Sequence, residues 1–249
     1  MRLRRSPLRA VERTATFTAT SPSLVDHPSR GGAVLTCCWS VKGGSGTTVV
    51  AASLALLAAS APDGALLVDL GGDASAALGL PEPPGPGVWD WLLAQPSPEP
   101  EALEHLQITV APGLQLLPAG DGVGTTPTAQ RVDLLHRVLS ARESVVVVDA
   151  GLVPPSFVPL VARAHRSLLV LRPCYLALRR ASALPVRPTG IVLVCEPGRA
   201  LGRRDVEDVI GVRVQAEVDV DPTIARAVDA GLLASRLPRA LSRPLRTAA

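Results

Sequence analysis

Short apolar runs alternate along the chain with longer segments of helical patterning or composition. The apolar runs occupy residues 33–38, 65–70, 145–148, 167–171, 191–195 and 212–218. The helical segments occupy residues 49–59, 128–141, 157–164, 175–184, 205–210 and 223–230. Four consecutive valines at 145–148 are typical of a strand that is buried on both faces of a parallel sheet. The alternation predicts βαβ units with right-handed crossovers, hence an α/β fold in three layers, with helices on both faces of a mostly parallel, twisted sheet.

The composition favours one large domain. The chain has 249 residues, and 47% of them are hydrophobic, which is enough for one sizeable core. We place this domain at residues 32–235. Residues 1–31 form a basic tail that we expect to be disordered, and it lacks the apolar core of a signal peptide. Residues 236–249, rich in arginine and leucine, are predicted to form a C-terminal tail.

Charge, aromatic content and cysteine spacing argue against several classes of protein. A net charge of only +3 and an aromatic content of 2% disfavour a dedicated nucleic-acid binder. The four cysteines show no C-x-x-C spacing, which disfavours zinc and favours buried thiols in a reducing cytoplasm. No apolar run reaches the roughly 18 residues that a membrane-spanning helix needs.

The stretch from Trp39 to Thr48 carries the strongest functional signal. It reads W-S-V-K-G-G-S-G-T-T and joins the apolar run 33–38 to the segment 49–59. Glycines let the backbone curl so that consecutive N–H groups point at an anion, and the start of the next helix adds partial positive charge. This arrangement predicts a phosphate-binding loop. The alternative is a tight glycine turn that binds no ligand.

Two aspartates stand at predicted strand ends, where parallel sheets bind their ligands. Asp69 lies near the end of the run 65–70, and Asp149 directly follows the four valines. A carboxylate in this position holds hydrated Mg²⁺ directly or through water, opposite a loop hydroxyl such as that of Thr48. Either aspartate taken alone is also explained as the end of a strand or the cap of the next helix.

The loop resembles the deviant phosphate loop of the ParA/MinD family, K-G-G-x-G-K-[ST]. Lys42 is the only lysine of the chain and stands directly before Gly43 and Gly44, and Gly46 and Thr48 also match. The resemblance covers residues 33–235. Its other landmarks are Leu67-Val68-Asp69, Val148-Asp149-Ala150-Gly151 and residues 169–173 and 218–221. Residues 89–93 and 116–120 resemble the CpaE/MinD arm of the family.

The resemblance implies a single P-loop NTPase-like domain that binds ATP with Mg²⁺ and works as a homodimer. The residues expected to bind the nucleotide are Lys42, Gly43, Gly44, Ser45, Gly46, Thr47 and Thr48. Thr48 and Asp149 are expected to hold Mg²⁺. Lys42, Asp69 and Asp149 are expected to act in the reaction, with Lys42 reaching across the dimer to the partner's phosphates. A role of Lys42 in capping carbonyl groups within one subunit is the alternative.

Members of the CpaE/MinD arm position pili, secretion machinery or division septa, and ParA proteins partition chromosomes. The resemblance therefore implies a nucleotide-dependent positioning factor, with protein partners from such an apparatus.

Three departures from the family pattern predict weak nucleotide binding and slow or absent hydrolysis. Thr47 replaces the loop lysine, so a positive charge on the β- and γ-phosphates is lost. Gly71 replaces the second Asp of the family's D-x-D motif, and Asp73 would substitute for it only if the loop bends. The chain contains no asparagine, and neither Val194 nor Cys195 can supply the paired donor and acceptor with which an asparagine reads adenine.

The C-terminal residues allow two interpretations. Leucines recur at every fourth position from 233 to 245, with Arg236, Arg239, Arg243 and Arg246 between them. MinD-like relatives carry a terminal amphipathic helix that lies on the inner face of the membrane. We favour packing of the leucines against the domain, and Pro238 and Pro244 would interrupt a helix. The arginine pairs 179–180 and 203–204 indicate either a nonspecific DNA patch or ordinary solvated surface.

Two other functions remain open on this fold. The first is a pseudo-ATPase scaffold that keeps the dimer surface without cycling nucleotide. The second is an enzyme such as an amide ligase or a reductase-activating ATPase, which would need substrate-binding carboxylates or a cysteine pair near the loop.

Overall fold

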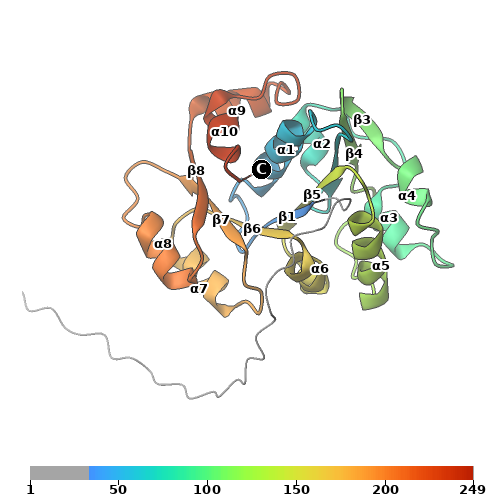
Figure 1. Cartoon of the computed structure of the whole chain (residues 1–249), viewed down its shortest axis with the longest axis horizontal. Coiled ribbons are helices and arrows are strands. Elements are labelled where there is room, and N and C mark those ends of the chain that lie inside the picture. Colours follow the sequence, from blue (N-terminus) through green and yellow to red (C-terminus); the bar gives the residue numbers. More distant parts are fainter. Residues whose placement is uncertain (1–33, 249) are drawn as a thin grey trace, which may run out of the picture. The chain divides into compact units, whose positions relative to one another are not determined.

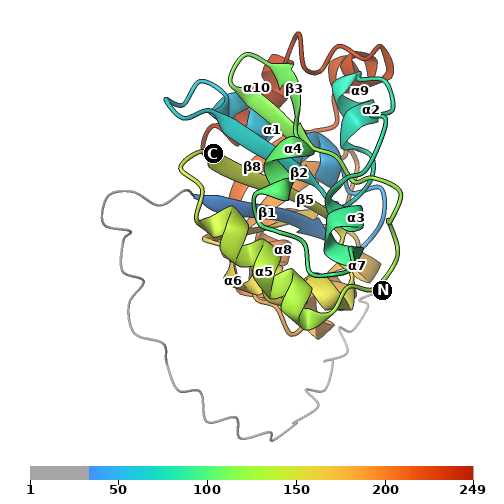
Figure 2. The same cartoon turned by 90° about the vertical axis from the view of Figure 1, so that its right-hand side faces the viewer.

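The computed structural model describes residues 34–248, so the tail predicted at residues 1–31 lies outside the described part. Within it, eight strands form one sheet in the order β3-β4-β2-β5-β1-β6-β7-β8 (Figures 1 and 2). Neighbouring strands pair in parallel, except for β3 and β4, which are antiparallel. The prediction of a mostly parallel sheet is confirmed.

The strands are β1 (Leu35–Ser40), β2 (Ala65–Asp69), β3 (Ile108–Ala111), β4 (Leu114–Leu117), β5 (Val145–Leu152), β6 (Arg166–Leu171), β7 (Gly190–Cys195) and β8 (Val214–Asp219). The helices are α1 (Thr47–Ala58), α2 (Ala74–Leu78), α3 (Val88–Leu93), α4 (Ala102–His105), α5 (Ala129–Ser140), the 3₁₀ turn η1 (Pro155–Phe157), α6 (Val158–Arg163), α7 (Tyr175–Ala183), α8 (Arg203–Ile210), α9 (Pro222–Asp229) and α10 (Arg239–Leu245).

Helices cover both faces of the sheet, which gives the three layers predicted. In Figure 1, α1, α2, α9 and α10 lie on one side of the strands, and α5 to α8 lie on the other. Side chains of β1 alternate between the two cores, with Leu35, Cys37 and Trp39 in one and Cys38 in the other. All six residues of β1 are buried, as expected for a strand with helices on both of its faces.

Strand β3 of the edge hairpin is the part of the sheet that the sequence did not reveal, whereas residues 114–117 were predicted as a strand and form β4. Residues near 108 suggested only a short element of unspecified type. The structure forms β3 there and returns through Pro112 and Gly113 to β4, with Gly113 at a φ of 76°. Such a left-handed φ favours glycine. With only four residues, β3 is too short to show a clear period.

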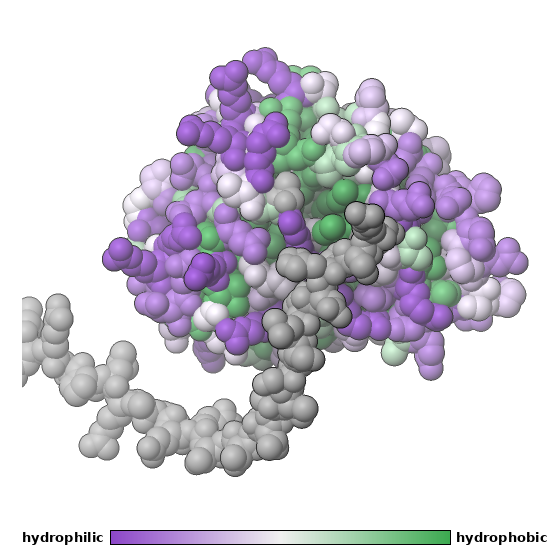
Figure 3. All heavy atoms as spheres, in the orientation of Figure 1, coloured by the Kyte–Doolittle hydropathy of each residue, from purple (hydrophilic) through white to green (hydrophobic). Residues whose placement is uncertain are grey.

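The C-terminal segment packs against the domain. Leu233, Leu241 and Leu245 are buried in the core that α1 and β8 share. Helix α10 forms despite Pro244, which lies in its last turn, and Pro238 directly precedes the helix. The arginines between the leucines are exposed, and hydrophilic side chains gather over α9 and α10 in Figure 3. The segment that the sequence suggested as a separate tail therefore contributes its leucines to the core, as the favoured interpretation required.

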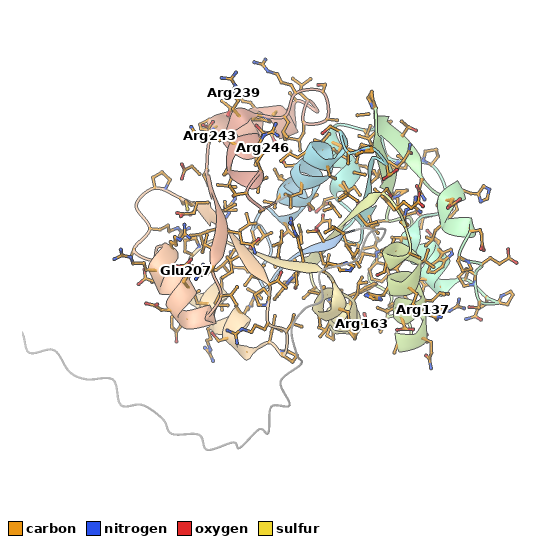
Figure 4. All side chains as sticks on the ribbon, viewed as in Figure 1. Arg137, Arg163, Glu207, Arg239, Arg243 and Arg246 are labelled. Atoms are coloured by element: carbon orange, nitrogen blue, oxygen red, sulfur yellow. The ribbon has the colours of Figure 1, made fainter. Side chains whose placement is uncertain are left out.

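Arg239, Arg243 and Arg246 lie on or beside α10, as Figure 4 shows. Within residues 34–248, no helix combines the length and the apolar character needed to cross a bilayer.

Candidate functional site

The topology brings three functional segments to one edge of the sheet. Strand β5 lies between β1 and β2, and its Asp149 is in register with Cys38 of β1 on one side and Asp69 of β2 on the other. The glycine loop follows β1 directly. Because parallel strands share the direction of their carboxyl ends, the loop, Asp69 and Asp149 meet at this edge, where such sheets bind ligands.

The glycine loop has an open inner face. Gly44 and Gly46 have φ values of 72° and 87°, in the left-handed region that side chains disfavour. A Cβ placed on Gly43 or Gly44 would meet no atom within 4 Å. The hydroxyl of Ser45 donates a 2.7 Å hydrogen bond to the carbonyl of Lys42 and closes the turn. No side chain caps the start of α1, so its first N–H groups remain available to an anion.

A hollow of about 490 Å³ lies against this loop. All of residues 43–48 line it, so the structure brings together six of the seven residues predicted to bind nucleotide. The opposite wall includes Gly71, Asp73, Trp89, Val123 and residues 150–152. No lysine or arginine is among the lining residues, because Thr47 occupies the lysine position of the loop.

Asp149 is fully buried beside the hollow. Its Oδ1 accepts a 3.0 Å hydrogen bond from the N–H of Gly151, whereas its Oδ2 has no partner among the described residues. Burial raises the pKa of Asp149 to about 6, against the lowering effect of the Thr48 hydroxyl. Thr48 lies close enough to act on the carboxylate but forms no hydrogen bond of good geometry with it. A buried oxygen without a partner indicates that a donor or a cation is missing from this position.

The carboxylate of Asp69 is hydrogen-bonded to the backbone of the loop that follows β2. Its Oδ1 accepts hydrogen bonds from Gly71 (3.0 Å) and Gly72 (2.7 Å), and its Oδ2 accepts one from Ala74 (2.9 Å). Burial raises its pKa, and the three amides lower it in part. Neither Asp69 nor Asp149 is among the residues that line the hollow. The three amides fix the carboxylate of Asp69 in place, so Asp69 holds the shape of the loop that follows β2.

The loop that Asp69 holds brings Asp73 to the hollow. Gly72 bends the chain with a φ of 92°, and Asp73 then precedes α2 without a capping hydrogen bond from its side chain. Its carboxylate therefore remains free to face the hollow, which it lines. Gly71, in the place of the family's second Asp, carries no such group.

Lys42 does not line the hollow of its own subunit. The residue is half-buried, and no ion pair to its ammonium group is found among residues 34–248. This placement leaves the charge of Lys42 free to act elsewhere.

A second hollow, of about 230 Å³, adjoins the first, since Gly46 and Val49 line both. Its walls are largely apolar and include Val194, Val218 and Ile224. The charged residues of its lining are one arginine, Arg172, and three aspartates, Asp219, Asp221 and Asp229. An apolar slot with a few polar groups suits a nucleobase. The sequence pattern predicted no role for Arg172, although this residue directly follows the apolar run 167–171, as Asp149 directly follows the four valines.

The site fits Mg²⁺ together with a phosphate ligand. Among the described residues, no cluster of three or more His, Cys, Asp or Glu side chains is arranged to hold a metal ion. Mg²⁺ in nucleotide sites typically takes one or two protein oxygens and completes its shell with phosphate and water. The free Oδ2 of Asp149 and the hydroxyl of Thr48 match that requirement.

Comparison with solved structures identifies the fold. A ParA family ATPase from Chlorobium tepidum superposes with a TM-score of 0.71 at 20% identity, covering 86% of this chain and 96% of the other. MinD from Aquifex aeolicus gives 0.68 at 18% identity, covering 86% and 94%. MinD from Pyrococcus horikoshii, solved with Mg-ADP, gives 0.64 at 17% identity, covering 86% and 93%.

This chain has the ParA/MinD fold. No protein-family model matches the sequence, and no curated protein matches it. At 17–20% identity, what is shared is the ParA/MinD fold, and the chemistry of the hollow has to follow from this chain's own residues.

Proposed function

We propose that the chain is a ParA/MinD-type protein that binds ATP with Mg²⁺ in the hollow at the glycine loop and acts as a nucleotide-dependent positioning factor. The observation that carries this proposal is the unpartnered, buried Oδ2 of Asp149 next to Thr48 and an open loop. This is the arrangement that a Mg-nucleotide requires. The solved relatives include MinD bound to Mg-ADP.

The backbone of Gly43, Gly44, Ser45 and Gly46 would hold the phosphates, and Thr48 with Asp149 would hold Mg²⁺. When bound, Mg²⁺ supplies positive charge that offsets the phosphates. The apolar second hollow would receive the base. Asp69 would fix the loop that carries Asp73, and Asp73 would take the place of the missing second Asp in positioning the attacking water.

The partner that we propose across the hollow is a second copy of the chain. Leu152, Tyr175 and Leu176 are 57%, 76% and 42% exposed. Leu152 is the last residue of β5 and lines the hollow, and Tyr175 and Leu176 begin α7, which follows β6. Exposed apolar side chains grouped at a ligand site favour a protein interface. Lys42, which forms no ion pair with residues 34–248, would then reach the phosphates held by the partner.

The cellular role belongs to the same proposal. MinD from Aquifex aeolicus has been solved in complex with MinC, which supports a role built on a protein partner. We propose a CpaE/MinD-like cytoplasmic protein with partners in a pilus, secretion or division apparatus. The exposed arginines beside α10 are the place where contact with an anionic membrane would occur.

Isothermal titration with ATP-Mg tests the proposal. We expect saturable binding that weakens strongly when EDTA removes Mg²⁺. The rival function is a scaffold that keeps the fold without nucleotide, and Thr47 is the observation that favours it. No binding at millimolar ATP would decide for the scaffold.

Lys42→Ala is expected to abolish ATP-dependent dimerisation while changing the stability of the monomer by less than about 0.5 kcal/mol, as is typical of surface positions. Sedimentation velocity with and without ATP-Mg measures the effect. Arg204→Ala removes an exposed cation away from the site and serves as the control. If Lys42→Ala still dimerises with ATP-Mg, Lys42 does not act across the dimer, and the alternative role of capping carbonyl groups within one subunit holds.

A further inference from the structure

Arg172 is held in an unusual way at the end of β6. Its Nη1 donates a 2.8 Å hydrogen bond to Oε1 of Glu196. Glu196 is held in turn by Arg199, whose Nε donates a 2.6 Å bond to Oε2. The Nε–H of Arg172 is buried and has no hydrogen-bond partner among residues 34–248. The guanidinium is thus fixed at one end and unsatisfied at its Nε.

An unsatisfied Nε–H restricts what can complete the site. A guanidinium carries five N–H donors and no acceptor, so only an acceptor atom can satisfy it. Leaving a buried donor without a partner costs free energy, which a ligand that supplies the acceptor would recover. Arg172 lines the second hollow together with Gly46, and Gly46 also lines the phosphate hollow. A ligand that occupies both hollows therefore passes the side chain of Arg172.

The charges around the two hollows point to the same side chain. Among the residues of 34–248 that line either hollow, Arg172 is the only lysine or arginine. The other charged lining residues are carboxylates, namely Asp73, Asp219, Asp221 and Asp229. A nucleoside triphosphate is strongly negative, and Thr47 provides no charge to offset it. Without Arg172, the charged side chains among the described lining residues would all be negative.

We propose that Arg172 is the resident cation of the nucleotide site and that its Nε–H donates a hydrogen bond to the bound nucleotide. Glu196, clamped by Arg199, fixes the guanidinium at its Nη1 end. Arg172 thereby supplies part of the charge lost at Thr47. This inference rests on the proposed binding of ATP-Mg.

Titration calorimetry with ATP-Mg on the full chain tests the inference. Arg172→Ala is expected to weaken binding about 10-fold or more, the usual loss for a hydrogen bond to a charged group. Arg172→Lys keeps the charge and the apolar stem but lacks the Nε donor, so it is also expected to weaken binding, by a smaller factor. Arg204→Ala is the matched control. It removes an exposed arginine that lines neither hollow, and we expect less than about a 3-fold change.

Inorganic triphosphate with Mg²⁺ serves as a second probe. A loss in Arg172→Ala for both ligands places the contact on the phosphates, and a loss for ATP alone places it on the nucleoside; both results support the proposal. If wild type and both Arg172 variants bind ATP-Mg equally, Arg172 has no such role, while the proposed function stands. If the wild type itself binds no ATP-Mg, the proposed function fails and this inference fails with it.

Discussion

Asp149→Asn is expected to stabilise the unliganded protein while it abolishes Mg²⁺-dependent nucleotide binding. Asp149 is fully buried, and burial raises its pKa from 3.8 to about 6. A shift of this size corresponds to roughly 3 kcal/mol of unfavourable free energy for the charged form in the folded protein. The amide removes the charge and keeps the shape. Urea unfolding at pH 7.5, with and without ATP-Mg, measures both effects.

The pH dependence of this difference follows from linkage. Because the pKa of Asp149 is higher in the folded than in the unfolded chain, the folded state binds more protons between pH 3.8 and about 6. The free energy of unfolding therefore falls as the pH rises through that window. We expect the gain in Asp149→Asn to be full above pH 6 and to disappear near pH 4.

Asp133→Asn is the control for this experiment. Asp133 is exposed, and its hydrogen bond with Arg163 lowers its pKa, the opposite direction from Asp149. No stabilisation is expected there. If Asp149→Asn instead destabilised the apo protein at pH 7.5, Asp149 would have an uncharged partner or a bound cation at rest, and its open coordination position would not exist.

Thr47→Lys is expected to tighten ATP-Mg binding and to create measurable hydrolysis. Thr47 lines the phosphate hollow at the first residue of α1, where the family carries its loop lysine. A group that stabilises developing charge on phosphates is worth about 3 kcal/mol, or about two powers of ten in rate. Phosphate release under saturating ATP-Mg, compared with the wild type, measures the gain.

Two further variants separate charge from other effects of this substitution. Thr47→Met has a similar length to lysine without the charge, and we expect no gain from it. Thr47→Lys combined with Asp73→Ala tests whether Asp73 positions water, and we expect the gain to be largely lost. Turnover that is as high in Thr47→Met as in Thr47→Lys would show that the missing charge is not what limits this loop.

The sequence predicted those features that depend on local patterns. Four consecutive valines and the glycine spacing after residues 33–38 depend on backbone sterics alone, so β5, β1 and the loop were foreseeable. The order of the strands, and with it the register of Asp149 between Cys38 and Asp69, arises from pairing between distant segments. For that reason the sequence could not distinguish the surroundings of the two aspartates. Asp69 accepts from three backbone donors, and Oδ2 of Asp149 has no partner among residues 34–248.

The proposed functions of Arg172 and Asp73 also depend on contacts that exist only in the folded chain. Both needed a three-dimensional neighbour before they could be assigned, Glu196 for the first and the amides held by Asp69 for the second. A position directly after a strand was a visible signal for Arg172, but arginine is common in this chain and its unsatisfied Nε is a property of the folded state. The C-terminal leucines were the reverse case, because their four-residue spacing from 233 to 245 was enough to indicate a buried stripe.

The place of Trp89 in the wall of the phosphate hollow has a practical consequence. Its indole N–H donates to the carbonyl of Leu70, at the start of the loop that carries Asp73. Trp39 and Trp91 do not line this hollow, so Trp89 alone among the tryptophans should change its fluorescence when the hollow fills. The intrinsic emission of the unlabelled protein should therefore report nucleotide arrival in real time, and Trp89→Phe should silence that signal.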